Sequence, residues 1–92
     1  MIENMIKHRG KAQIISSILE EADGGARKTA IMYGAYLSVS QLDGYLELLQ
    51  ENGMLEYVID TRHYHTTEKG ATFRKAYDEV AEALRPKVGR FR

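Results

Sequence analysis

The sequence predicts a mainly helical domain with one small β-hairpin, in the order three helices, two strands and a C-terminal helix. Three patterns predict this class. Apolar residues recur at helical spacing as far as residue 49, apolar and polar residues alternate over residues 55–60, and helical spacing returns after residue 67. The 92 residues, 43% of them hydrophobic, have the size of a single domain with a modest core.

The first two helices are short, and glycines follow both of them. The first is expected at residues 11–21 and ends at the Asp-Gly-Gly of residues 23–25. The second is expected at about residues 27–33, with Gly34 letting the chain leave it. The residues expected in the core are Ile14, Ile15, Ile18, Leu19 and Ala22 of the first helix, and Ile31 and Met32 of the second.

The third helix has the best-marked start in the sequence. Ser38 and Gln41 have the spacing of a capping box, and Leu37 and Leu42 have the spacing of a hydrophobic staple. Its core-facing residues are expected to be Leu42, Tyr45, Leu46 and Leu49, with Val39, Ser40, Asp43, Gly44, Glu47 and Gln50 facing outward. Asn-Gly at residues 52–53 closes this helix.

A hairpin follows the third helix. Leu55, Tyr57 and Ile59 alternate with polar or smaller residues, so they are expected to point inward from the first strand. The chain turns near residues 61–62 and returns as a strand at residues 63–66.

The last helix begins at an N-cap and ends at a proline. Thr67 is the predicted N-cap, with Glu68 in the first turn. The helix is expected to run to about Arg85, where Pro86 stops it.

The charges balance in number but not in position. Lys and Arg total 13 and so do Asp and Glu, yet residues 7–11 and 85–92 contain only basic charges. The acids Asp43, Glu47, Glu51, Glu56 and Asp60 lie in a segment without Lys or Arg. The absence of cysteine excludes disulfides and thiolate metal sites. The polar N-terminus and the lack of ~18 consecutive apolar residues predict a cytoplasmic protein.

Two segments resemble a known family. "KTAIMYGAYLSVSQLDGYLELLQENGMLE" and "YHTTEKG" are similar to the archaeal winged helix-turn-helix family of small, coiled-coil-dimerising DNA-binding proteins and predicted transcriptional regulators. The resemblance covers about residues 11–77. It implies double-stranded DNA binding in the nucleoid, with the third helix in the major groove, the hairpin as a wing, and a homodimer formed by the last helix as an antiparallel coiled coil. Relatives commonly carry lysines where this third helix has Ser40, Asp43 and Gly44.

The expected DNA contacts combine cations for phosphates with short polar side chains. The phosphate contacts are expected to be Lys7, Arg9, Lys11, Arg27, Lys28 and Arg62, with polar contacts from Tyr36, Ser40 and Gln41 and a pH-dependent contact from His63. The alternative for Arg27 and Lys28 is a solvated helix start. The alternative function is a winged-helix protein-interaction module whose acidic third helix docks a basic partner.

Other patterns give weaker signals. His63 and His65 share one strand face and offer half of a metal site or part of a solvated wing surface, but no third ligand is near them in sequence. The run "GGARKT" has Arg27 where a phosphate-binding loop needs glycine. Neither a nucleophile elbow nor a partnered carboxylate is evident, so no enzyme activity is expected. No cofactor, metal, membrane contact or small-molecule ligand is expected either.

The last helix carries a short apolar seam. Its members, Phe73, Tyr77, Val80 and Leu84, are spaced four, three and four residues apart. The first two are expected to pack on their own domain and the last two to contact a second copy. Met1, Ile2, Met5 and Ile6 are further candidates to cover the seam, within the chain or across a dimer. The predicted organisation is therefore one domain, with residues 11–66 as core and wing, 67–85 as the dimerisation helix and 86–92 as a basic tail.

Overall fold

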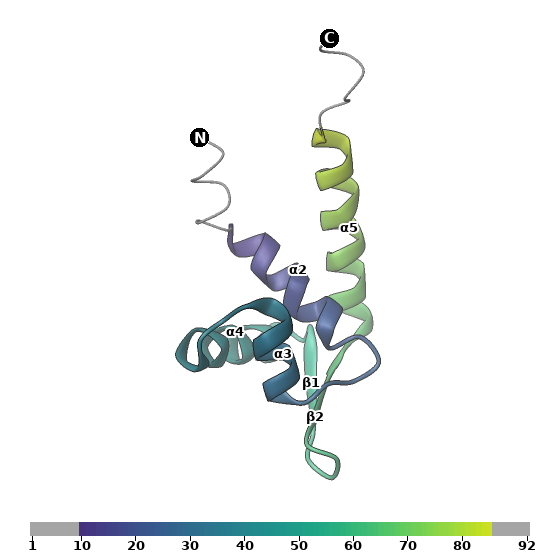
Figure 1. Cartoon of the computed structure of the whole chain (residues 1–92). Helices are drawn as coiled ribbons and strands as arrows, with labels where there is room; N and C mark the ends of the chain where they lie inside the picture. The colour runs from purple at the N-terminus through teal and green to yellow at the C-terminus, as the bar shows by residue number, and fades with distance from the viewer. Residues whose placement is uncertain (1–9, 86–92) are drawn as a thin grey trace.

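The computed structural model describes residues 10–85 and confirms the predicted fold class (Figure 1). The elements are α2 (Lys11–Glu21), α3 (Lys28–Ala35), α4 (Val39–Glu51), β1 (Leu55–Val58), β2 (His63–Thr66) and α5 (Glu68–Leu84). The first three helices gather around the base of the hairpin. α5 leaves this body in one direction and the hairpin tip points in the opposite direction (Figure 1).

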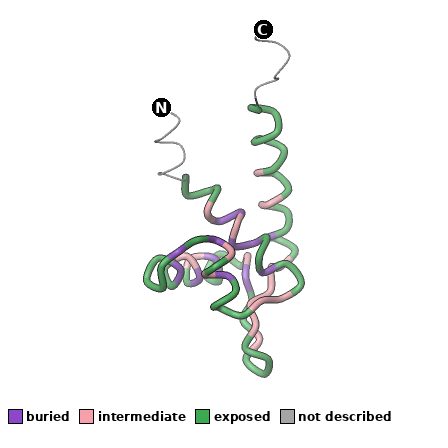
Figure 2. Tube along the Cα trace, in the orientation of Figure 1, coloured by how far each residue is buried: buried purple, intermediate pink, exposed green. Residues whose placement is uncertain are grey.

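The core lies where α2, α3 and α4 meet β1. Its largest fully buried side chains are Ile18, Leu19, Ile31, Leu42 and Leu49. Burying each such side chain stabilises the fold by roughly 1.5–3 kcal/mol relative to leaving it exposed. Figure 2 shows the buried residues concentrated in this body, whereas most of α5 is exposed. The predicted core stripes of the first and third helices are confirmed, although Ile14 and Tyr45 are only partly buried at the edge of the core.

Local hydrogen bonds begin α4 as the sequence predicts. The Ser38 hydroxyl accepts a hydrogen bond from the Gln41 N–H at 3.3 Å, and the Ser38 N–H donates to the Gln41 side-chain oxygen at 3.0 Å. The capping box is therefore complete. Leu37 and Leu42, on either side of the cap, are both buried in the core.

The turn between α3 and α4 differs from the prediction. Gly34 does not end α3, because the helix continues to Ala35 and Tyr36 adopts the left-handed conformation with φ 57°. The N–H of Leu37 then donates to the Met32 carbonyl at 3.1 Å, which closes the helix end in the manner of a Schellman motif. Gly34 instead lies inside the helix against the carboxyl group of Glu21, an exposed side chain that would have to move to make room for a Cβ.

The hairpin, called the wing here (residues 55–66), pairs Leu55 with Thr66 and Val58 with His63 in antiparallel register. The prediction that Ile59 points inward was wrong. The strand ends at Val58, and Ile59 lies near the tip with 76% of its surface exposed. A two-stranded wing reaches the core only at its base, so Leu55 alone among the first-strand residues predicted to point inward is buried.

A backbone bridge ties the wing to the helices. The Ala26 N–H donates to the Tyr64 carbonyl at 3.0 Å, and the Tyr64 N–H donates to the Ala26 carbonyl at 2.8 Å. The rings of Tyr57 and Tyr64 pack together across the two strands, with centroids 4.8 Å apart. These contacts hold the wing against the segment before α3.

The start of α5 is anchored in the body, and the rest of it projects outward. The Thr67 hydroxyl accepts a hydrogen bond from the Gly70 N–H at 3.1 Å and donates to the Gly53 carbonyl at 2.6 Å, which confirms the predicted N-cap. Phe73 packs against the core and Tyr77 is half-buried, but Val80 and Leu84 are 57% and 77% exposed. Pro86, predicted to stop the helix, lies outside the described residues, as does the predicted basic tail.

Replacing two helical glycines with alanine should change the stability of the protein in opposite directions. A Cβ at Gly70 would collide with the Met54 carbonyl oxygen and lie 2.9 Å from the Thr66 methyl, whereas a Cβ at Gly44 would have nothing within 4 Å. We expect Gly70→Ala to lower the free energy of unfolding by about 1–3 kcal/mol through overpacking. Gly44→Ala should raise it by about 1 kcal/mol through helix propensity. Urea unfolding followed by circular dichroism measures both, and equal changes of the same sign would contradict the packing described here.

Candidate nucleic-acid interface

The outer face of α4 is an exposed helical surface that follows the α3–α4 turn. We define it as Ser40, Asp43, Gly44, Glu47 and Glu51, all of which are exposed. The buried leucines on the opposite side orient these residues toward solvent. The sequence predicted this outward orientation correctly for the first four. The face combines short or absent side chains with carboxylates, and it contains no cation.

A cation from α3 lies on one flank of this face. The Lys28 ammonium is 2.5 Å from a carboxylate oxygen of Asp43. The hydrogen bond to Asp43 raises the pKa of Lys28 above its ordinary value, so the ammonium stays charged throughout the neutral range. The sequence placed both residues at the surface but gave no sign that they pair.

A second cation lies on the opposite flank. Lys11, the first residue of α2, lines an open groove of about 340 Å³ together with Gln41, Gly44, Tyr45 and Leu48 of α4. Gly44 contributes no side chain to this groove, which leaves the helix backbone open to close approach. The structure thus brings together two predicted contact residues, Lys11 and Gln41.

The two flanks are nearly opposite each other around the helix. Gln41 and Asp43 are separated by two residues, which places them about 160° apart at 3.6 residues per turn. Lys11 and Lys28 therefore lie on the two sides of α4. A helix in a DNA groove has phosphates on both of its sides, and this arrangement of cations fits that geometry.

The remaining predicted contacts lie at the start of α3, in the turn after it and on the wing. Arg27 is the exposed N-cap of α3 and makes no side-chain capping hydrogen bond, and the first turn of this helix contains no acidic residue. Tyr36 is exposed in the turn before α4. Arg62 occupies a left-handed position in the wing turn, and His63 begins β2. Lys7 and Arg9 lie outside the described residues.

The paired histidines have a structural contact. The rings of His63 and His65 lie edge to face with their centroids 6.2 Å apart, which confirms that they share one side of the strand. His65 lies against Gly25, where a Cβ would come within 2.8 Å of the imidazole. Among residues 10–85, no group of three or more His, Cys, Asp or Glu side chains is arranged to hold a metal ion.

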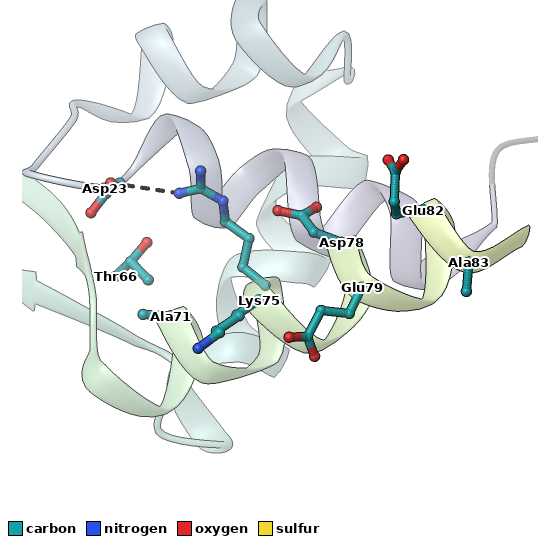
Figure 3. Close-up of a pocket in the computed structure, with 9 residues that line it drawn as sticks. Asp23, Thr66, Ala71, Lys75, Asp78, Glu79, Glu82 and Ala83 are labelled. Atoms are coloured by element: carbon teal, nitrogen blue, oxygen red, sulfur yellow. Dashed lines mark ion pairs between the residues drawn. The ribbon is translucent and has the colours of Figure 1, made fainter. Parts of the chain in front are cut away.

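A larger hollow of about 720 Å³ runs along α5, and Asp23 and Thr66 of the body also line it (Figure 3). Its charged side chains have both signs, and Arg74 forms an ion pair with Asp23 at 3.5 Å. Lys75, Asp78 and Glu79 follow along the helix (Figure 3). The hollow contains none of the residues predicted to contact DNA, so its size does not make it the candidate site.

The helices, the turn, the wing and the outward α4 define the class of protein. A family model described as winged helix-turn-helix matches residues 8–85, and the chain belongs to this family, as the sequence resemblance predicted. Among solved structures it is similar to Sso10a-2, a DNA-binding protein from Sulfolobus solfataricus, with a TM-score of 0.67 and 26% sequence identity over 86% of this chain and 100% of that chain. A comparison with curated protein sequences gave no significant match. Within residues 10–85, the helices are too short or too polar to cross a membrane.

Proposed function

We propose that the protein binds double-stranded DNA as a homodimer and serves as a transcriptional regulator or nucleoid-associated protein, with a binding function and no catalytic one. The observation that carries this proposal is an exposed helix-turn-helix with Lys11 and Lys28 on the two flanks of α4. Membership of the winged helix-turn-helix family and the similarity to a DNA-binding protein support it.

The charge distribution predicts how such binding works. Residues 10–85 contain 8 Lys and Arg residues against 12 Asp and Glu residues, whereas residues 1–9 and 86–92 together contain five against one. The described body is thus net acidic, and the cations outside it offset that charge. Affinity should come from scattered phosphate contacts more than from base reading, because α4 offers few neutral donors and the side-chain oxygen of Gln41 already accepts a hydrogen bond in the capping box.

The first test is a salt titration of duplex binding, followed by fluorescence anisotropy. If about 4 to 6 phosphates are neutralised per dimer, log K should fall with log salt with a slope of about −4 to −5. Unrelated duplex sequences should bind with similar affinity. A flat salt dependence, or no binding at about 50 mM salt, would reject DNA binding of the proposed kind.

A charge reversal on α4 tests whether this helix faces the DNA. Glu47→Lys replaces a repelled carboxylate with an attracted ammonium on the outer face of α4 and should tighten binding by about tenfold at low salt. Glu79→Lys is the matched control, because it makes the same change on the exposed side of α5. Equal effects of the two changes would indicate a general charge effect and would remove α4 from the interface.

The acidity of α4 also favours a second candidate, a module that docks a basic protein partner. Its outer face carries three carboxylates, and one of the two cations that flank it, Lys28, is already paired with Asp43. In that case Glu47→Lys should weaken the partner complex and leave duplex binding unchanged. The same variant therefore separates the two functions.

The homodimer part of the proposal depends on the outer half of α5. Val80 and Leu84 leave an apolar strip on a helix whose other outward residues are mostly polar or small, and such a strip is typical of a contact with another chain. A second copy of α5 with the same spacing supplies a matching strip.

Changing both Val80 and Leu84 to Glu should give a folded monomer, because the strip lies outside the core. Sedimentation equilibrium measures the mass, and circular dichroism checks the fold. The control is Ala71→Glu with Lys75→Glu, which adds acids to exposed α5 positions outside the seam. A wild-type protein that is already monomeric at high micromolar concentration would exclude the dimer.

A further inference from the structure

We propose that Asp43 competes with DNA phosphate for Lys28. The ion pair within the helix-turn-helix thereby weakens the binding of phosphate by this lysine. This inference rests on the proposed DNA binding and assigns a role to an acid that the family resemblance leaves out of place. Asp43 acts through Lys28 and is a positioning residue, not a DNA contact.

The contact links two elements that face the same partner. Lys28 is the first residue of α3, and Asp43 lies in the second turn of α4. Their side chains are 45% and 54% exposed, so a phosphate oxygen can reach the ammonium without any change in the core. Asp43 belongs to the outer face of α4, so the pair lies at the edge of the surface where the proposed duplex would bind.

Carboxylate and phosphate are alternative acceptors for the same ammonium. A lysine is a compact charge on a flexible stem, so it can exchange one acceptor for another with a small movement. An exposed ion pair adds little to stability, and a duplex offers a dense row of phosphates. Contact with DNA should therefore displace Asp43 from Lys28, although the exchange lowers the net gain from the new contact.

The exchange of acceptors should depend on the salt concentration, but not on changes of pH near neutrality. The hydrogen bond from Lys28 to Asp43 raises the pKa of the lysine, which keeps the ammonium charged well above pH 7. Once displaced, the Asp43 carboxylate remains on the α4 flank near the phosphates and repels them. Asp43 thus weakens binding twice, by occupying Lys28 and by its own charge.

A double-mutant cycle separates these two effects. Asp43→Asn removes the competing charge, and Glu47→Gln removes the same charge from the next turn of α4, where the structure shows no ion pair for Glu47 among residues 10–85. We expect Asp43→Asn to tighten duplex binding about fivefold more than Glu47→Gln, the scale of an exposed ion pair. Asp43→Glu keeps a carboxylate within reach and should resemble the wild type.

Lys28→Gln provides the second side of the cycle. It should change affinity little in the wild type, where Asp43 already offsets the lysine, and should cost about fivefold in the Asp43→Asn background. In the Glu47→Gln background its effect should match that in the wild type. The salt slope of Asp43→Asn should also be steeper than that of the wild type by up to about 0.9. Without the competing carboxylate, Lys28 neutralises a DNA phosphate fully, and the counterion of that phosphate is released.

Fluorescence anisotropy at about 50 mM salt, with a salt series for each variant, measures all of these quantities. Thermal unfolding checks that each variant is folded. Additive effects of Lys28→Gln and Asp43→Asn, or equal effects of Asp43→Asn and Glu47→Gln, would overturn the competitor role while leaving DNA binding intact. Failure of the wild type and of every variant to bind duplex would overturn both proposals. Binding by Asp43→Asn alone would support the competitor role and would reject duplex binding by the wild-type protein.

Discussion

The rotation of α4 about its own axis is the constraint on which the functional surface depends. Leu42, Leu46 and Leu49 are buried on one side of the helix, and no other side carries comparable apolar surface. Because successive residues differ by about 100° around a helix, turning α4 by a single position would bring Asp43 toward the core and expose a leucine. The hydrophobic effect thus selects one orientation, and the positions of Asp43, Gly44 and Glu47 follow from it.

Both local and long-range interactions stabilise this orientation of α4. The capping box of Ser38 and Gln41 sets where α4 begins, so the helix enters the core in a fixed register. The bridge between Ala26 and Tyr64 holds the wing against the segment that leads into α3. Lys28 follows that segment directly and reaches across to α4. The wing, α3 and α4 are therefore connected through one short stretch of chain.

The electrostatics of the molecule explain how an acidic third helix is compatible with the proposed DNA-facing surface. Lys28 neutralises Asp43 on one flank, and Lys11 approaches the other flank next to Gly44. Exposed charges separated by more than a Debye length are screened, so the nearest cations matter more than the net charge of the body. In the proposed binding mode, the acids of α4 lower the affinity for DNA and, with few neutral donors beside them, leave little capacity for reading bases.

The sequence alone determined the features whose partners are close in the chain. Helical spacing identified the core of α2 and α4. Ser38 with Gln41 and Thr67 with Glu68 marked two helix starts, and alternation located the wing. These features depend on hydrogen bonds within one turn and on the periodic burial of one face, which local sequence encodes. The tertiary structure alone decided the rest. It placed Gly34 against Glu21 and not at a helix end, exposed Ile59 at the wing tip, paired Lys28 with Asp43 and brought Lys11 beside Gly44. Each of these outcomes depends on how whole elements pack against one another, and neither residue spacing nor side-chain type determines that packing.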